Sequence, residues 1–130
     1  MSSIEDERAK RRFLRPVGVG EAHDTYETLV DGVARELDDP SLDRNDVVRD
    51  FLTEIYGGPG GMGTAAGRAR AYSFDPRRTT LEPEYYRDID GERYRPLKPL
   101  HWLWIQFDRS PLGRNLHLGV LFRRMLAARL

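Results

Sequence analysis

The chain contains no cysteine, only two lysines and no long apolar run. The missing cysteine excludes disulfides, thiolate nucleophiles and cysteine-ligated zinc sites. No stretch approaches the roughly 18 consecutive apolar residues of a transmembrane helix, and Met1–Glu7 lack the apolar core of a signal peptide. We therefore expect a soluble, cytoplasmic protein without a membrane span.

Charged residues are abundant and balanced, with 21 basic and 21 acidic side chains among 130 residues. The hydrophobic content of 39% suits a modest core, and the length suits a single small domain over residues 1–130. Composition divides this domain into a helical part at 1–56, a glycine- and arginine-rich loop at 57–80, and an aromatic segment with a C-terminal helix at 81–130.

The charges are unevenly distributed along the chain. The formal net charge is −6 for residues 1–56, +3 for 57–80, −2 for 81–108 and +5 for 109–130. Two interpretations stay open: the basic C-terminal segment faces the acidic half within the same fold, or it binds nucleic acid or a membrane surface.

Three helices are predicted in the first 56 residues. Ser2 or Ser3 caps a short helix that ends near Arg15, before Pro16. Apolar residues then recur at the helical period over 21–38, from Ala22 to Leu37, and again after a cap at Ser41 or Asp43, from Val47 to Tyr56. Two such helices with a short connection ordinarily form an antiparallel hairpin with facing apolar stripes.

The segment from Gly57 to Gly67 has almost nothing to bury, so it predicts a linker or mobile loop. Its glycines superficially recur as they do in phosphate-binding loops. However, no strand precedes them and the stretch contains no lysine, which argues against nucleotide binding.

The last third is rich in proline and aromatic residues. Asp90-Gly91 predicts a short β-hairpin between Tyr85–Ile89 and Glu92–Leu97. Residues 101–107 fit either a strand that is apolar on both faces or the start of a buried helix. Ser110 and Pro111 then begin an amphipathic C-terminal helix. The predicted fold class is therefore mainly α, with an irregular aromatic segment.

The sequence contains few candidates for catalytic or metal-binding residues. His23 and Glu27 have the spacing of two metal ligands, but other ligands are not apparent, and we predict no metal and no cofactor. His101 between Leu100 and Trp102 is the one candidate base for a small enzyme. Further side chains of types used in catalysis are Ser110, His117, Asp108 and the carboxylates in 82–90. For Ser110, a role as a helix cap is a sufficient explanation.

Arginine interleaved with aromatic residues at 68–78 is typical of single-strand nucleic-acid binding, because arginine contacts phosphate and aromatic rings stack on bases. This second hypothesis uses the loop together with the basic C-terminal helix. Its residues are Arg68, Arg70, Arg77, Arg78, Arg114, Arg123 and Arg124.

The leading hypothesis is a small non-catalytic interaction or assembly subunit. It rests on the large apolar surface that residues 85–107 and the C-terminal helix offer, and on the enrichment of aromatic residues and arginine at interfaces. The partner is a larger protein assembly or a second copy. The expected anchors are Trp102, Trp104, Phe107, Phe122 and Arg123.

Overall fold

The structure is a computed structural model that describes residues 18–57, 61–85 and 90–130, and it is mainly helical. No strand occurs in these three ranges. The helix predicted for residues 2–15 lies outside them. The helices are α2 (Val19–Asp38), α3 (Arg44–Tyr56), α4 (Ala65–Phe74), α5 (Gly91–Tyr94), α6 (Lys98–Arg109) and α7 (Leu116–Ala127), with short 3-10 turns at Gly61–Gly63, Pro76–Arg78, Glu82–Tyr85 and Pro111–Arg114.

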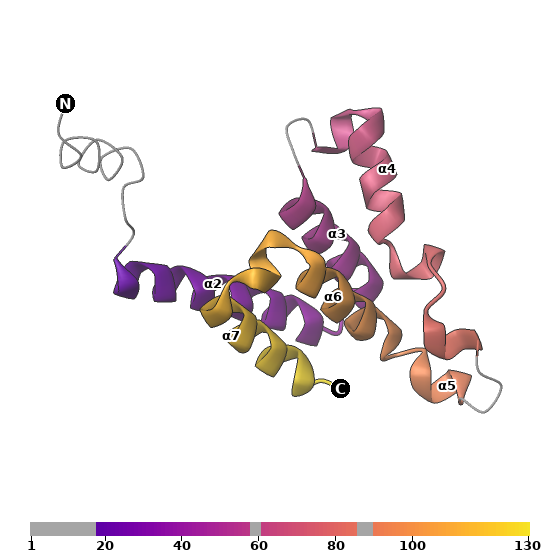
Figure 1. Ribbon diagram of the computed structural model, residues 1–130. Coiled ribbons are helices and arrows are strands. Elements are labelled where there is room, and N and C mark those ends of the chain that lie inside the picture. The colour runs from indigo at the N-terminus through magenta and orange to yellow at the C-terminus, as the bar shows by residue number, and fades with distance from the viewer. Residues whose placement is uncertain (1–17, 58–60, 86–89) are drawn as a thin grey trace.

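Helices α2 and α3 form where the apolar periodicity predicts them. Asp43 caps α3, because its carboxylate accepts a hydrogen bond of 2.8 Å from the Asn45 N–H. Helix α2 contacts both α3 and α7 (Figure 1). Asn115 donates to the Tyr26 hydroxyl near the start of α7, and Arg129 pairs with Asp38 just beyond its end, so α2 and α7 run in the same direction.

The core lies where α2, α3, α6 and α7 meet. Its centre is an aromatic stack in which the Phe107 and Phe122 rings lie 3.9 Å apart between centroids and Phe51 lies 5.4 Å from Phe122. Aliphatic side chains from all four helices surround this stack. They include Val30, Val33, Leu37, Val48, Leu52, Leu100, Leu103, Leu118 and Leu126.

The prediction of a loop over 57–80 is wrong for residues 65–74, which form α4. The Thr64 hydroxyl accepts a 3.0 Å hydrogen bond from the Gly67 N–H and so caps this helix. Gly67 also lets the preceding turn approach closely, since a Cβ there would lie 1.4 Å from the Gly61 carbonyl oxygen. Gly61 itself has a φ of +46°, which favours glycine. Glycines here permit packing rather than a loose linker.

The prediction of a β-hairpin at Asp90-Gly91 is also wrong in its second arm. The Asp90 carboxylate accepts hydrogen bonds from the Glu92 and Arg93 N–H groups and starts α5. Aspartate before glycine serves as a helix cap as well as a turn, and here the cap prevails. Residues 86–89 of the first arm lie outside the described residues.

Residues 101–107 belong to a helix, α6, which begins at Lys98 with Pro99 in its first turn, where proline costs no hydrogen bond. The expected C-terminal helix is divided. Ser110 caps only the 3-10 turn at 111–114, and Asn115 then caps α7 through the Leu118 N–H. In the described ranges, no helix combines the length and apolar character that crossing a bilayer requires.

Candidate functional site

Two of the predicted interface anchors are core residues. Phe107 and Phe122 are fully buried and stack on each other, so they present no surface to a partner. The prediction of these two anchors is wrong, because α3 and α6 rather than a partner cover the apolar face of α7 that carries Phe122. Trp102 and Trp104 are half-buried against the core. The Trp102 indole N–H donates to the Phe74 carbonyl oxygen at 3.0 Å and so ties α6 to α4.

Arg123 also has a role inside the fold. Its Nε donates to the Asp108 carboxylate at 2.8 Å, and a terminal nitrogen donates to the Gly113 carbonyl oxygen at 2.9 Å. The guanidinium lies 5.9 Å from the centre of the Phe107 ring. Arg123 therefore holds the turn at 111–114 onto α6 and α7.

The arginines of the nucleic-acid hypothesis fall into two separate groups. Arg68 and Arg70 lie on α4 and Arg77 and Arg78 in the turn after it, whereas Arg114 ends the turn before α7 and Arg124 lies on α7. Helix α4 packs on α3, and α7 packs on α2 and α6, so the two helices lie apart in Figure 1. Arg77 is held by carboxylates, with nitrogens 3.0 Å from Asp43 and 2.9 Å from Asp46. Hydrogen bonds and charge from these carboxylates raise the pKa of Arg77.

Arg78 lies over the exposed ring of Tyr72, with 4.8 Å between its guanidinium carbon and the ring centre. This pair is a cation–π contact at the surface of α4. Arg114 and Arg124 are exposed and make no ion pair with any residue in the described ranges.

The candidate base His101 is half-buried, and its Nδ1 lies 2.8 Å from the Tyr94 hydroxyl. Burial raises the pKa of Tyr94, and the Glu84 charge adds to this. No carboxylate is hydrogen-bonded to His101 among the residues with described positions. Ser110 is buried with its hydroxyl donating to the Phe107 carbonyl oxygen, which is a structural role.

The pair of His23 and Glu27 is a surface contact of 2.9 Å on α2. The described part of the chain contains no group of three or more histidine, aspartate or glutamate side chains that would hold a metal ion.

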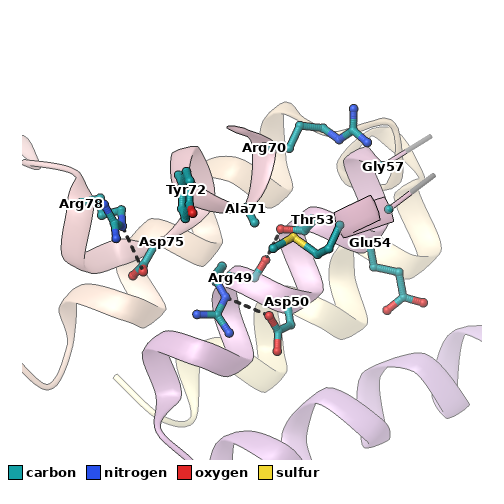
Figure 2. A pocket seen from close by; sticks show the side chains of 12 residues that line it. Arg49, Asp50, Thr53, Glu54, Gly57, Arg70, Ala71, Tyr72, Asp75 and Arg78 are labelled. Atoms are coloured by element: carbon teal, nitrogen blue, oxygen red, sulfur yellow. Dashed lines mark hydrogen bonds and ion pairs between the residues drawn. The ribbon is translucent and has the colours of Figure 1, made fainter. Parts of the chain in front are cut away.

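One concave surface lies between α3 and α4 and has a volume of about 640 Å³ (Figure 2). Its charges are mixed. Arg49 donates to Asp50 at 2.9 Å, and Arg78 lies 3.8 Å from Asp75. Arg70 Nε is buried without a hydrogen bond to any described residue. Its side chain extends toward Gly57, away from Asp75 and Arg78, so the arginines do not converge on one anion position.

A second concave surface, which we call the acidic groove, lies between α2 and α3 and has a volume of about 500 Å³. Its floor is apolar and consists of Leu29, Val33, Val47 and Phe51. Carboxylates form its rim on both sides. They are Glu36 on α2, Asp43 at the cap of α3, and Asp46, Asp50 and Glu54 on α3.

The rim carboxylates differ in how far they are already neutralised. Hydrogen bonds from the Asn45 N–H and from Arg77 hold the pKa of Asp43 below its ordinary value, and Arg49 contacts both Asp46 and Asp50. Glu36 and Glu54 make no ion pair with a described residue. The groove thus keeps uncompensated negative charge at both walls.

The acidic groove continues along α2 toward its N-terminus. A shallower hollow beside it shares Thr28 and Leu29 and adds Glu21, Asp24 and Thr25. At the centre of the groove, a Cβ added to Gly32 would meet nothing within 4 Å, so the space above this residue is open. The α2 side of the groove therefore has no side chain at its middle position, Gly32, and carries acidic residues on either side of it.

Sequence reasoning missed this groove, although a signal for it was present. Small or polar residues recur every three or four positions on α2, beside the apolar stripe, at Glu21, Thr25, Thr28, Gly32 and Glu36. Such a stripe is typical of an ordinary solvent-exposed helix face. It indicates a groove only when the position of the neighbouring helix, here α3, is known.

Comparison with known proteins gave no match to this chain among protein-family models, curated proteins or solved structures. The functional assignment therefore depends on the geometry of the chain itself.

Proposed function

We propose that this chain is a non-catalytic protein-interaction module whose acidic groove binds a basic amphipathic helix of a partner protein. The observation that carries the proposal is the combination of an apolar floor with carboxylate rims on both α2 and α3. A helix laid in such a groove buries its apolar residues and places arginine or lysine against the rims, which is a recurring mode of peptide recognition.

The charge of the two helices supports the same partner chemistry. Residues 18–57 contain eleven acidic side chains and three arginines. A field of this sign attracts a basic segment and raises its association rate, and added salt weakens the attraction. Apolar contacts with the floor are less sensitive to salt and supply the remaining affinity.

The test uses a fluorescein-labelled amphipathic peptide built from leucine and arginine, with a scrambled peptide of equal charge for comparison. Fluorescence anisotropy should show binding of the amphipathic peptide that weakens between about 0.05 M and about 0.5 M salt. The scrambled peptide should bind more weakly at both salt concentrations, because it has no continuous apolar face. Equal binding of the two peptides would contradict the proposal.

Two variants locate the binding site. Gly32→Leu should fill the open centre of the groove and weaken binding by about tenfold or more, which corresponds to about 1.4 kcal/mol. Gly20→Leu is its matched control, because it lies on the same helix, also has open space around its Cβ, and does not line the groove. Glu36→Lys should weaken binding at low salt, and Asp31→Lys, on another side of α2, should do so less.

A second candidate function is single-stranded nucleic-acid binding through α4. The exposed Tyr72 ring, with Arg78 packed over it and Arg68 one helical turn away, favours stacking on a base beside a phosphate contact. It predicts binding of a single-stranded oligonucleotide that falls steeply with salt and is reduced by Tyr72→Ala. Oligonucleotide binding that Tyr72→Ala leaves unchanged would contradict it.

A further inference from the structure

The outward face of α7 carries apolar and basic side chains that the core does not use. Leu116 is 73% exposed and Val120 is 39% exposed. Arg124 lies one further turn along, and Arg114 just precedes the helix. Because residues four apart share one side of a helix, Leu116, Val120 and Arg124 form a line. We call these three residues together with Arg114 the basic ridge.

The basic ridge has the chemistry of the segment that the acidic groove would bind. It presents two apolar side chains in line, and its two arginines make no ion pair with a described residue. The groove presents an apolar floor and the uncompensated carboxylates of Glu36 and Glu54. The wider charge distribution agrees, since residues 61–130 contain thirteen basic and seven acidic side chains, whereas residues 18–57 are strongly acidic.

The ridge does not serve the groove of its own chain. Helix α7 packs along the side of α2 that carries Tyr26 and Asp38, through the contacts with Asn115 and Arg129. At 3.6 residues per turn, Tyr26 and Asp38 lie about 120° apart around α2. Gly32, which lines the groove, lies about 120° from each of them and so on the other side of the helix. The two surfaces therefore face different directions on one molecule.

We propose that the basic ridge of one copy docks in the acidic groove of a second copy, so that the chain associates head to tail. This inference rests on the proposed function of the groove and names its occupant. The contact joins two different surfaces, so every dimer keeps one free groove and one free ridge, and further copies add until a ring closes or a chain continues.

Complementary variants provide the test, read by sedimentation velocity over a concentration series at low salt. The groove variant combines Gly32→Leu with Glu36→Lys, and the ridge variant combines Leu116→Asp with Val120→Glu. An acid at 116 suits the first turn of α7, so the helix should be retained, and circular dichroism checks this. Val19→Asp is the matched control, since Val19 is 89% exposed at the start of α2 and belongs to neither surface.

We expect wild type and Val19→Asp to associate in a salt-dependent manner, and each double variant on its own to remain monomeric. An equimolar mixture of the two double variants should form a dimer and nothing larger, because only one intact groove and one intact ridge can meet. Association of the ridge variant on its own, or a mixture without dimer, would overturn the proposal.

The amphipathic peptide separates this inference from the function on which it rests. The folded ridge variant keeps an intact groove and should still bind the peptide. If it binds the peptide while wild type remains monomeric at every concentration, head-to-tail association is wrong and the proposed function stands. If neither the peptide nor a second copy binds, both are wrong.

Discussion

Gly32 shows how one residue can lower helix stability and at the same time shape the groove. Glycine in a helix costs about 1 kcal/mol relative to alanine because of its backbone freedom. At Gly32 nothing lies within 4 Å of an added Cβ, so no packing constraint explains its presence. The absence of a side chain at Gly32 leaves the acidic groove open at this point of α2.

Gly32→Ala should therefore raise the free energy of unfolding by about 0.5–1 kcal/mol. Urea denaturation monitored by circular dichroism measures the change. Binding of the amphipathic peptide should fall only slightly, because a methyl group fills less of the groove than the leucine of Gly32→Leu. A lower free energy of unfolding would show that the space above Gly32 is not open.

Phe122 lies at the centre of the aromatic stack, between Phe51 and Phe107. Phe122→Ala should lower the free energy of unfolding by about 3–5 kcal/mol, because it removes a fully buried ring and leaves a cavity. Leu116→Ala, at an exposed position of the same helix, should change it by about 0.5 kcal/mol or less. Similar small effects from both variants in thermal and urea denaturation would contradict the assignment of Phe122 to the core.

At the scale of elements, α4 depends on a close approach between its first turn and the 3-10 turn before it. Gly67 allows this approach, and its backbone N–H is bound by the Thr64 cap. A sequence reader sees a run of glycines and predicts a loop, because the distance between Gly67 and Gly61 is not visible in the order of residues. The alanines and arginines that follow are good helix formers, and that local signal was available.

Gly67→Ala should destabilise the protein, in contrast to Gly32→Ala. The added Cβ would lie 1.4 Å from the Gly61 carbonyl oxygen, so the turn must move, and this cost exceeds the gain in helix propensity of about 1 kcal/mol. The free energy of unfolding from urea denaturation measures the sign directly. The hydrogen-exchange rates of the α4 amides should rise in the variant. Unchanged exchange rates in α4 would contradict the close contact between Gly67 and Gly61.

At the scale of the whole molecule, carboxylates at the α2–α3 end link stability to pH. The Arg129 hydrogen bond lowers the pKa of Asp38, Ser41 hydrogen bonds lower that of Asp39, and the Asn45 N–H lowers that of Asp43. The unfolded chain therefore binds protons at these positions at higher pH than the folded chain does.

These three groups should contribute stability that is fully present above the unfolded aspartate pKa of about 3.9 and lost as pH falls through the lower folded values. We expect the free energy of unfolding to be nearly constant from about pH 5 to 7 as far as these groups are concerned, and to fall below about pH 4. Urea denaturation across this range measures it, with Asp38→Asn expected to show a smaller acid loss. An increase in stability on acidification would contradict the assignment.

The sequence by itself determined the local features of this protein. Helical periodicity and the Asp43 cap placed α2 and α3, because both depend only on residues within a few turns of one another. The absence of cysteine excluded thiol chemistry through composition alone. Tertiary structure alone decided that residues 101–107 are a helix, that Phe107 and Phe122 are core rather than interface, and that two helices enclose an acidic groove. These outcomes depend on contacts such as Asn115 with Tyr26 and Arg129 with Asp38, between residues 89 and 91 positions apart. Burial is set by which distant surfaces meet, and a local pattern records only that a surface is apolar.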